Sequence, residues 1–184
     1  MKNINIGLFI VLLLTIFIIG CRKHHHNSES KININIPVGT IVAKIDGIET
    51  TFNIDAVADT ITEQFDFYRK IYRLEVSGRN NTLVNSKKII IKFWAMPVRV
   101  IDNGTYPDLN KQIYNYIDYI RDTWIYRING YEPYLSKATI VKNDSLVQGI
   151  FSGKLIIGLG PGINEPPQPL FHVVENGMFN VKVN

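Results

Sequence analysis

The residue with the most clearly defined chemistry is Cys21, the only cysteine of the 184-residue chain. It follows Ile18, Ile19 and Gly20, so two branched apolar residues and a small residue precede the thiol. This order is that of a bacterial lipobox, in which cleavage occurs before the cysteine and the thiol forms a thioether to diacylglycerol. The sequence therefore predicts lipidation of Cys21. A single cysteine also excludes an internal disulfide framework and zinc sites built from several cysteines.

Histidine chemistry has few candidates. His24, His25 and His26 follow Cys21 closely, and His172 is the only other histidine of the chain. Adjacent histidines of an extended segment point in alternating directions and make a poor preorganised metal site, so we interpret them as part of a polar tether. A single further histidine nearly excludes metal sites built from several histidines and nucleophilic sites built from serine and histidine. We expect His172 in the core or at its rim, with no metal and no cofactor.

Carboxylates are the remaining candidates for catalysis, because a glycoside hydrolase needs two acids about 5–10 Å apart. The candidates are Asp66, Glu75, Asp102, Asp118, Asp122 and Glu132. Most of them lie beside turns or alternate with apolar residues, as solvated strand positions do, and their spacing marks no pair. The glycine-rich run 158–162 lacks the Lys-Ser/Thr pair and the following helix of a phosphate loop. We therefore expect no enzyme activity, with an acid-pair glycoside hydrolase as the least favoured alternative.

Aromatic residues gather between positions 106 and 134. Rings with polar tips make platforms for sugars and for protein partners. The candidate ligand-binding aromatics are Tyr114, Tyr116, Tyr119, Trp124, Tyr126 and Tyr131. Ordinary sheet packing is the alternative, since tyrosine is a favoured strand residue. Nucleic acid is not an expected partner, because the formal net charge is only +4 and the basic residues are dispersed.

The elements that position these candidates begin with an export signal. Lys2 precedes the apolar segment 6–19, which is shorter than the about 20 residues of a membrane-spanning helix and fits a secretory signal. We predict a lipoprotein signal peptide over residues 1–20. The lipidated cysteine and a polar tether occupy residues 21–37, and a single β domain occupies residues 38–184.

A hairpin is predicted at the start of that domain. The dipeptide 46–47 is Asp-Gly, the preferred loop of a two-residue hairpin, and it lies between the alternating segments 41–45 and 48–52. A two-residue loop places Ile45 opposite Ile48.

The end of the chain carries a similar pattern. The dipeptide 176–177 is Asn-Gly, and it predicts a second hairpin between the segments 171–175 and 178–183, with Val174 opposite Phe179. The apolar face of this hairpin then carries His172, Val174, Phe179, Val181 and Val183.

Four further strands are predicted, over residues 71–77, 88–95, 136–142 and 146–157. Gly149 shares a face with apolar residues of the last strand, which indicates a bend or a close backbone approach. A short helix is an alternative to extended structure in 55–69 and in 108–120, where periodicity does not decide; for 108–120 we favour strand. The pattern predicts an all-β fold, a single antiparallel β-sandwich or partly closed barrel of about ten strands.

Several short motifs are distributed along most of this domain. They are Ala43-Lys-Ile-Asp-Gly47, Leu74-Glu-Val-Ser-Gly78, Gly104-Thr-Tyr106, Val147-Gln-Gly-Ile-Phe-Ser-Gly153 and Glu175-Asn-Gly-Met-Phe-Asn-Val181. With these motifs the chain resembles a family of uncharacterised Bacteroidota lipoproteins. The resemblance implies a secreted, lipid-anchored β domain and carries over no catalytic residue. The chain lacks acidic residues directly after Cys21, where surface-exported members of such families have them. This favours an outer-membrane anchor that faces the periplasm.

These observations predict a cell-envelope protein that is attached to a membrane through its lipid. The β domain is expected to be non-enzymatic, with a binding or structural role toward a glycan or an envelope protein. A carbohydrate-binding module that uses the Tyr/Trp-rich surface is the alternative.

Overall fold

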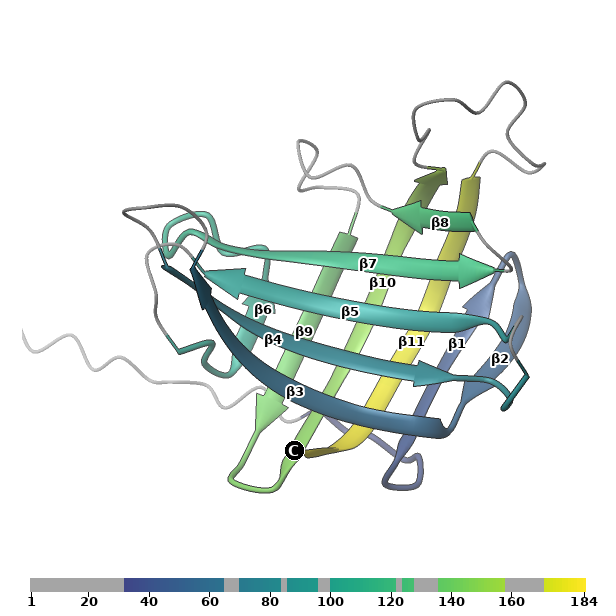
Figure 1. Ribbon diagram of the computed structural model, residues 1–184, viewed down its shortest axis with the longest axis horizontal. Helices are drawn as coiled ribbons and strands as arrows, with labels where there is room; N and C mark the ends of the chain where they lie inside the picture. The colour runs from purple at the N-terminus through teal and green to yellow at the C-terminus, as the bar shows by residue number, and fades with distance from the viewer. Residues whose placement is uncertain are drawn as a thin grey trace, which may run out of the picture.

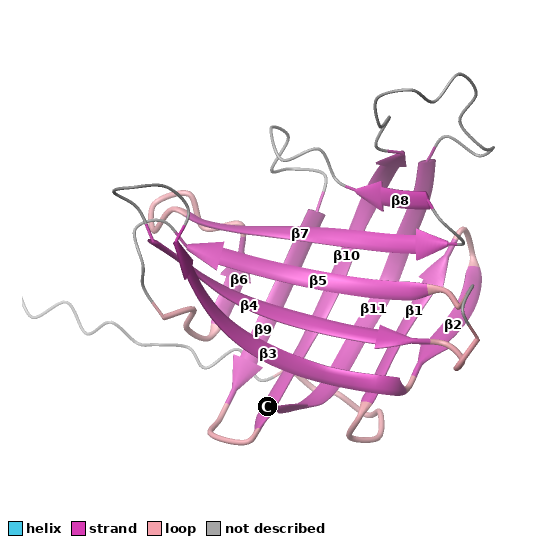
Figure 2. Ribbon diagram, in the orientation of Figure 1, coloured by secondary structure: helices cyan, strands magenta, loops and turns pink. Residues whose placement is uncertain are grey.

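The computed structural model describes residues 32–64, 70–83, 86–95, 100–121, 124–127, 136–157 and 171–184. These ranges hold eleven strands and no helix (Figure 2). The strands are β1 (Thr40–Ile45), β2 (Ile48–Phe52), β3 (Ile54–Gln64), β4 (Lys70–Arg79), β5 (Lys88–Ala95), β6 (Gly104–Tyr106), β7 (Ile113–Arg121), β8 (Trp124–Arg127), β9 (Ser136–Lys142), β10 (Leu146–Ile157) and β11 (Phe171–Val183). The predicted all-β fold is confirmed. Cys21, the signal segment 1–20 and most of the tether lie outside the described residues.

The strands form two layers that cross one another (Figure 1). The front layer contains β3, β4, β5, β7 and β8, and the rear layer contains β2, β1, β11, β10, β9 and β6. The layers join at two corners, where Lys182 and Val183 of β11 pair with β3 and where the end of β10 pairs with β8. The sheet is therefore partly ring-like, consistent with the predicted sandwich or partly closed barrel. Among the described pairings only β11–β3 is parallel, so the sheet is mixed rather than wholly antiparallel.

The first hairpin has the predicted register. Ile45 lies opposite Ile48, and Ile41 lies opposite Phe52. Asp46 and Gly47 have φ angles of 52° and 82°. Positive φ at both central residues is what a type I′ turn requires, and this turn matches the twist of the flanking strands.

The predicted second hairpin is wrong, because β11 continues through Asn176-Gly177 without turning back. Asn176 has a φ of 50°, and the pairing of β11 with both β1 and β10 shifts by one residue around this position. The extra residue is a β-bulge, a device that also accepts a left-handed residue. Because a bulge shifts the side-chain alternation by one residue, Val174 and Phe179 still face the core together.

Neither of the two segments that were open to a helix contains one where it is described, although residues 109–112 form a turn rather than a strand. Ile54–Gln64 is β3, which curves along the front layer (Figure 1), while 65–69 lie outside the described residues. Ile113–Arg121 is β7, the strand favoured above, and pairs along its length with β5. Pairing with β5 buries alternate side chains of β7, and this tertiary gain outweighs the helical spacing of a few apolar residues.

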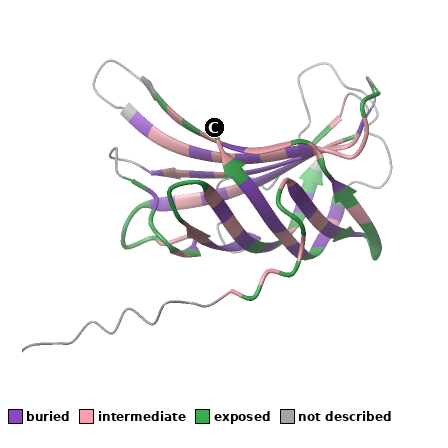
Figure 3. Cartoon of the chain, turned by 90° about the horizontal axis from the view of Figure 1, so that it is seen from below, coloured by how far each residue is buried: buried purple, intermediate pink, exposed green. Residues whose placement is uncertain are grey.

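The core lies between the two layers, where buried segments of both sheets face each other (Figure 3). Ile89, Ile91, Phe93 and Ala95 of β5 are all fully buried and alternate with outward-facing residues. No helix in the described part of the chain has the length and apolar character that a membrane crossing demands.

Two glycines in the rear layer make room for aromatic rings. Gly149 of β10 lies opposite Phe179 of β11, and Phe151 lies opposite Gly177. A Cβ atom on Gly149 would lie 2.3 Å from the Phe179 ring, and one on Gly177 would lie 2.6 Å from the Phe151 ring. The rings therefore lie against bare backbone on neighbouring strands, which is the close approach that Gly149 predicted.

Candidate functional site

The outer face of the front layer carries the chain's clearest candidate site. On β5, the burial of Phe93 and Ile91 turns Trp94 and Lys92 outward. On β7, buried Ile113, Asn115 and Ile117 leave the intervening side chains on the same outer face. We define the aromatic–charged face by its members: Arg73 and Glu75 of β4, Lys92 and Trp94 of β5, Tyr114, Tyr116 and Asp118 of β7, and Arg127 of β8.

Three aromatic rings form a stack on this face. Trp94 pairs across the strands with Tyr114, and their ring centroids are 4.7 Å apart with an interplanar angle of 25°. Tyr116, two residues further along β7, stacks on Trp94 at 5.8 Å and 16°. All three side chains are only partly buried. The rings lie against each other at small interplanar angles, so part of the ring faces is covered within the stack.

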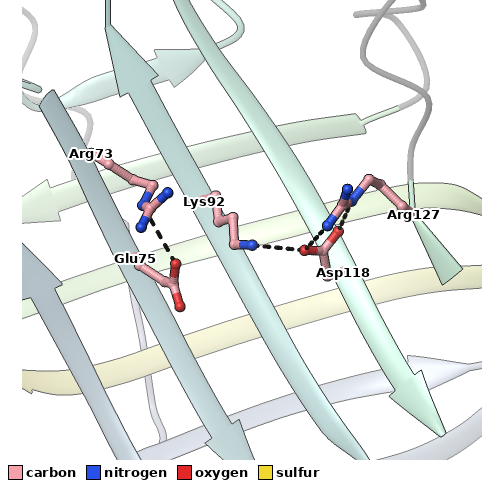
Figure 4. A network of polar contacts seen from close by, with 5 residues as sticks. All are labelled: Arg73, Glu75, Lys92, Asp118 and Arg127. Carbon is pink, nitrogen blue, oxygen red and sulfur yellow. Dashed lines mark hydrogen bonds and ion pairs between the residues drawn. The ribbon is translucent and has the colours of Figure 1, made fainter. Parts of the chain in front are cut away.

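A charged network lies beside the stack (Figure 4). The Asp118 carboxylate accepts hydrogen bonds from Lys92 Nζ at 2.9 Å and from Arg127 Nε and Nη2 at 2.7 and 3.1 Å. The Asp118 side chain is only 2% exposed, whereas that of Arg127 is 52% exposed. Burial raises the pKa of Asp118, but the hydrogen bonds from Arg127 and Lys92 outweigh it and hold the pKa below its ordinary value. Asp118 is therefore a fixed anion that orients two cations.

A second ion pair adjoins the network. Arg73 Nε lies 3.6 Å from Glu75 Oε2 on the same face of β4 (Figure 4). Strand pairing places Arg73 opposite Trp94 and Glu75 opposite Lys92. The face is thus continuous across four strands, from the β4 ion pair over the aromatic stack to Arg127 of β8.

The predicted aromatic cluster is divided between the two sides of the sheet. Tyr114 and Tyr116 face outward, but Tyr119 and Tyr126 are only 2% exposed and belong to the core. Trp124 also packs against the core. Tyr119 and Tyr126 are therefore not part of an open surface platform, and Trp124 is partly buried on the core side. Tyr131 lies outside the described residues.

Sequence reasoning missed Trp94, the centre of the stack, because it lies outside the tyrosine-rich segment. A signal was present, since Trp94 follows Phe93 in a predicted strand whose alternate apolar residues mark the inner face. Strand alternation alone would have turned Trp94 outward, and it would have separated Tyr116 from Tyr119.

His172 lies in the core, at 3% exposure, with its ring edge-on to Tyr119 and Tyr126. Its Nδ1 is 2.5 Å from the carboxylate of Asp46 in the β1–β2 turn, and the other carboxylate oxygen accepts a hydrogen bond from Val173 N. Within the described ranges, no three His, Cys, Asp or Glu side chains gather as a metal site would require. His172 is a structural link between the first turn and the last strand.

The three candidate acids that the structure describes do not make an evident catalytic pair. Asp118 is held ionised by two cations, so it lacks the proton that a general acid must donate. Glu75 is paired with Arg73, and Asp102 is exposed beside β6. Asp66, Asp122 and Glu132 lie outside the described residues.

Comparisons of the chain with protein-family models, with curated proteins and with solved structures return no match.

Proposed function

We propose that the chain is a lipid-anchored protein of the cell envelope whose β domain binds a protein partner, without catalysis, through the aromatic–charged face. The anchor rests on the lipobox at Cys21 and on the short apolar segment before it. Two or more acyl chains hold a protein stably on a bilayer, so no membrane-spanning segment is needed. The resemblance to Bacteroidota lipoproteins supports an outer-membrane site that faces the periplasm.

The observation that carries the binding function is the aromatic stack beside fixed guanidinium groups. Trp, Tyr and Arg are the residue types that dominate the energetics of protein interfaces. Here Trp94, Tyr114 and Tyr116 lie next to Arg73 and to the half-exposed Arg127. Such side chains need little further ordering when a partner arrives, because they are already held by stacking and by ion pairs.

The stack weighs against the alternative of a carbohydrate-binding module. A sugar ring packs on an open aromatic face, but Trp94 already stacks with Tyr114 and Tyr116. The other predicted rings, Tyr119 and Tyr126, are buried. A protein partner is favoured because it can use ring edges, hydroxyls and charged groups together.

Two experiments test this proposal. Cys21→Ala should release the intact chain from membranes, and persistent membrane pelleting of the variant would contradict the anchor.

For the binding face, a photo-reactive amino acid is placed in intact cells at Ile125 of β8 or at Ile150 of β10, which have nearly equal exposures of 43% and 42% on different layers. A discrete cross-linked product from Ile125 that is absent from Ile150 and is lost with Trp94→Ala supports the face. Equal products from both positions would refute it.

A further inference from the structure

The aromatic–charged face has a chemical polarity that identifies its partner more closely. An aromatic ring is negative over its face and positive at its edge. In the stack the rings of Tyr114 and Tyr116 lie against Trp94, so part of their negative faces is covered. The stack is therefore less negative toward a partner than three open rings would be.

The cations beside the stack add positive charge to the same face. The bonds of Arg127 to Asp118 use two of the five N–H donors of a guanidinium, and 52% of its side chain stays exposed. Lys92 gives one hydrogen bond to the same carboxylate. The Asp118 carboxylate that fixes these cations is only 2% exposed and the Lys92 side chain is 24% exposed, so Arg127 is the accessible charge of this network.

Both layers carry cations, but the kinds differ. The front layer carries Arg73, Arg79 and Arg127 together with Lys88 and Lys92, whereas the described cations of β1, β9, β10 and β11 in the rear layer are all lysines. Arginine presents a planar fork that matches a carboxylate in two hydrogen bonds, which lysine cannot do. Two of these guanidinium groups lie beside the aromatic stack, because Arg73 pairs opposite Trp94 and Arg127 shares Asp118 with Lys92.

From this juxtaposition we propose that the partner is an acidic protein surface, which presents Asp or Glu carboxylates to Arg127 and Arg73 on either side of the stack. The inference rests on the function proposed above and specifies the partner. A second copy of this chain does not fit, because its formal net charge is +4 and its own accessible face carries the same cations. Asp118 is a positioning residue in this interaction, since it orients the cations without meeting the partner.

The test uses the full-length chain in detergent micelles and a fluorescent oligoglutamate peptide as the probe. We expect binding that weakens with salt and no binding of an oligolysine peptide. Arg127→Gln removes the charge of a side chain that is 52% exposed and should weaken oligoglutamate binding about two- to fivefold, the range of an exposed ion pair. Arg73→Gln acts on a side chain that is 26% exposed and should weaken binding by a smaller factor within that range. Lys137→Gln removes one exposed charge from β9 in the rear layer and should leave the affinity unchanged.

The outcomes separate this inference from the proposed function. Equal losses in Arg127→Gln, Arg73→Gln and Lys137→Gln would mean that overall charge attracts the peptide, and would overturn the acidic-surface inference. Competition by polygalacturonate at lower carboxylate concentration than oligoglutamate would overturn it in favour of an acidic glycan. Absence of oligoglutamate binding, together with the specific cross-link from Ile125, would leave the binding face standing without the acidic partner. The thermal unfolding of each variant checks that the fold persists, and Arg73→Gln keeps the test valid if Arg127→Gln unfolds.

Discussion

The reciprocal glycine and phenylalanine pairs of β10 and β11 allow one sharp prediction about the rear layer. In Gly177→Ala, the new Cβ would meet three atoms within 2.7 Å, and all three belong to the ring of Phe151. No positive φ accompanies Gly177, so the cost of alanine is steric. In Gly149→Ala, the Cβ would meet the Phe179 ring at 2.3 Å and also the backbone oxygen of Thr139 at 2.5 Å.

The expected magnitudes follow from these contacts. Overpacking a core position costs about 1–3 kcal/mol, so each alanine variant alone should lose about that much stability. Phe151→Leu alone should cost about 1–2 kcal/mol, below the cost of truncation to alanine. Because leucine withdraws the atoms that clash with Ala at 177, we expect the double variant to be about as stable as Phe151→Leu alone. This corresponds to a coupling energy equal to the whole cost of Gly177→Ala, about 1–3 kcal/mol.

The second pair is the matched control. Phe179→Leu removes the ring from the vicinity of position 149, but the carbonyl oxygen of Thr139 remains 2.5 Å from the new Cβ. Rescue of Gly149→Ala should therefore be incomplete, with a smaller coupling energy than in the first pair. Urea unfolding of the purified full-length chain, followed by far-UV circular dichroism, measures all the variants. Additive losses in the first pair, or equal coupling in both pairs, would refute the steric reasoning.

Three further predictions concern titration and the first turn. Because the folded state lowers the pKa of Asp118, the contribution of Asp118 to the free energy of unfolding is complete above the ordinary pKa of 3.8 and is lost as the pH falls through the lower pKa of the folded state. In urea unfolding measured against pH, Asp118→Asn should therefore lose less free energy of unfolding on the acid side than the unchanged chain does. Burial raises the pKa of Tyr106 to about 12, so ultraviolet titration should show a late-ionising component that falls by one tyrosine in Tyr106→Phe, and an unchanged late component would contradict the assignment. Because the hydroxyl of Tyr106 donates to the Asp102 carbonyl oxygen at 2.6 Å, the same variant should lose about 1 kcal/mol in urea unfolding. Asp46→Asn keeps a residue that tolerates positive φ but removes the charge beside His172, and it should cost about 1–3 kcal/mol, whereas Asp144→Asn in the exposed β9–β10 turn should cost nothing measurable.

Local signals were sufficient for the first hairpin but not for the last strand. Asp46-Gly47 and Asn176-Gly177 carry the same turn chemistry, and in both places a left-handed residue does occur. A two-residue turn and a one-residue bulge put the same flanking side chains on the buried face, so the hydrophobic pattern around Val174 cannot tell them apart. Pairing decides the outcome, because β11 lies between β1 and β10 over most of its length, and folding back at Asn176 would leave parts of both strands unpaired.

The candidate face was predictable only in part. Tyr114 and Tyr116 were identified as candidates, but the density of aromatic residues along the sequence could not distinguish them from buried Tyr119. Strand alternation makes that distinction, because it places Tyr116 and Tyr119 on opposite faces of the sheet. Trp94 joins them through the pairing of β5 with β7, a contact between residues 20 positions apart that no local pattern reveals. The Asp118 network has the same origin, since Lys92 and Arg127 come from the strands on either side of β7.

The position of β11 has a consequence for how the chain reaches its native state. The β1–β2 hairpin is local and forms on the microsecond timescale of short hairpins, but the other edge of β1 pairs with a strand more than 120 residues later in the sequence. Until β11 docks, β1 and β10 each keep an open edge, and the β3 edge at that corner is open as well. Such non-local closure slows folding and leaves edges that template intermolecular pairing. We therefore expect the vulnerable species of this protein to be the chain in which β11 has not yet inserted, with protection from aggregation beginning when that single strand docks.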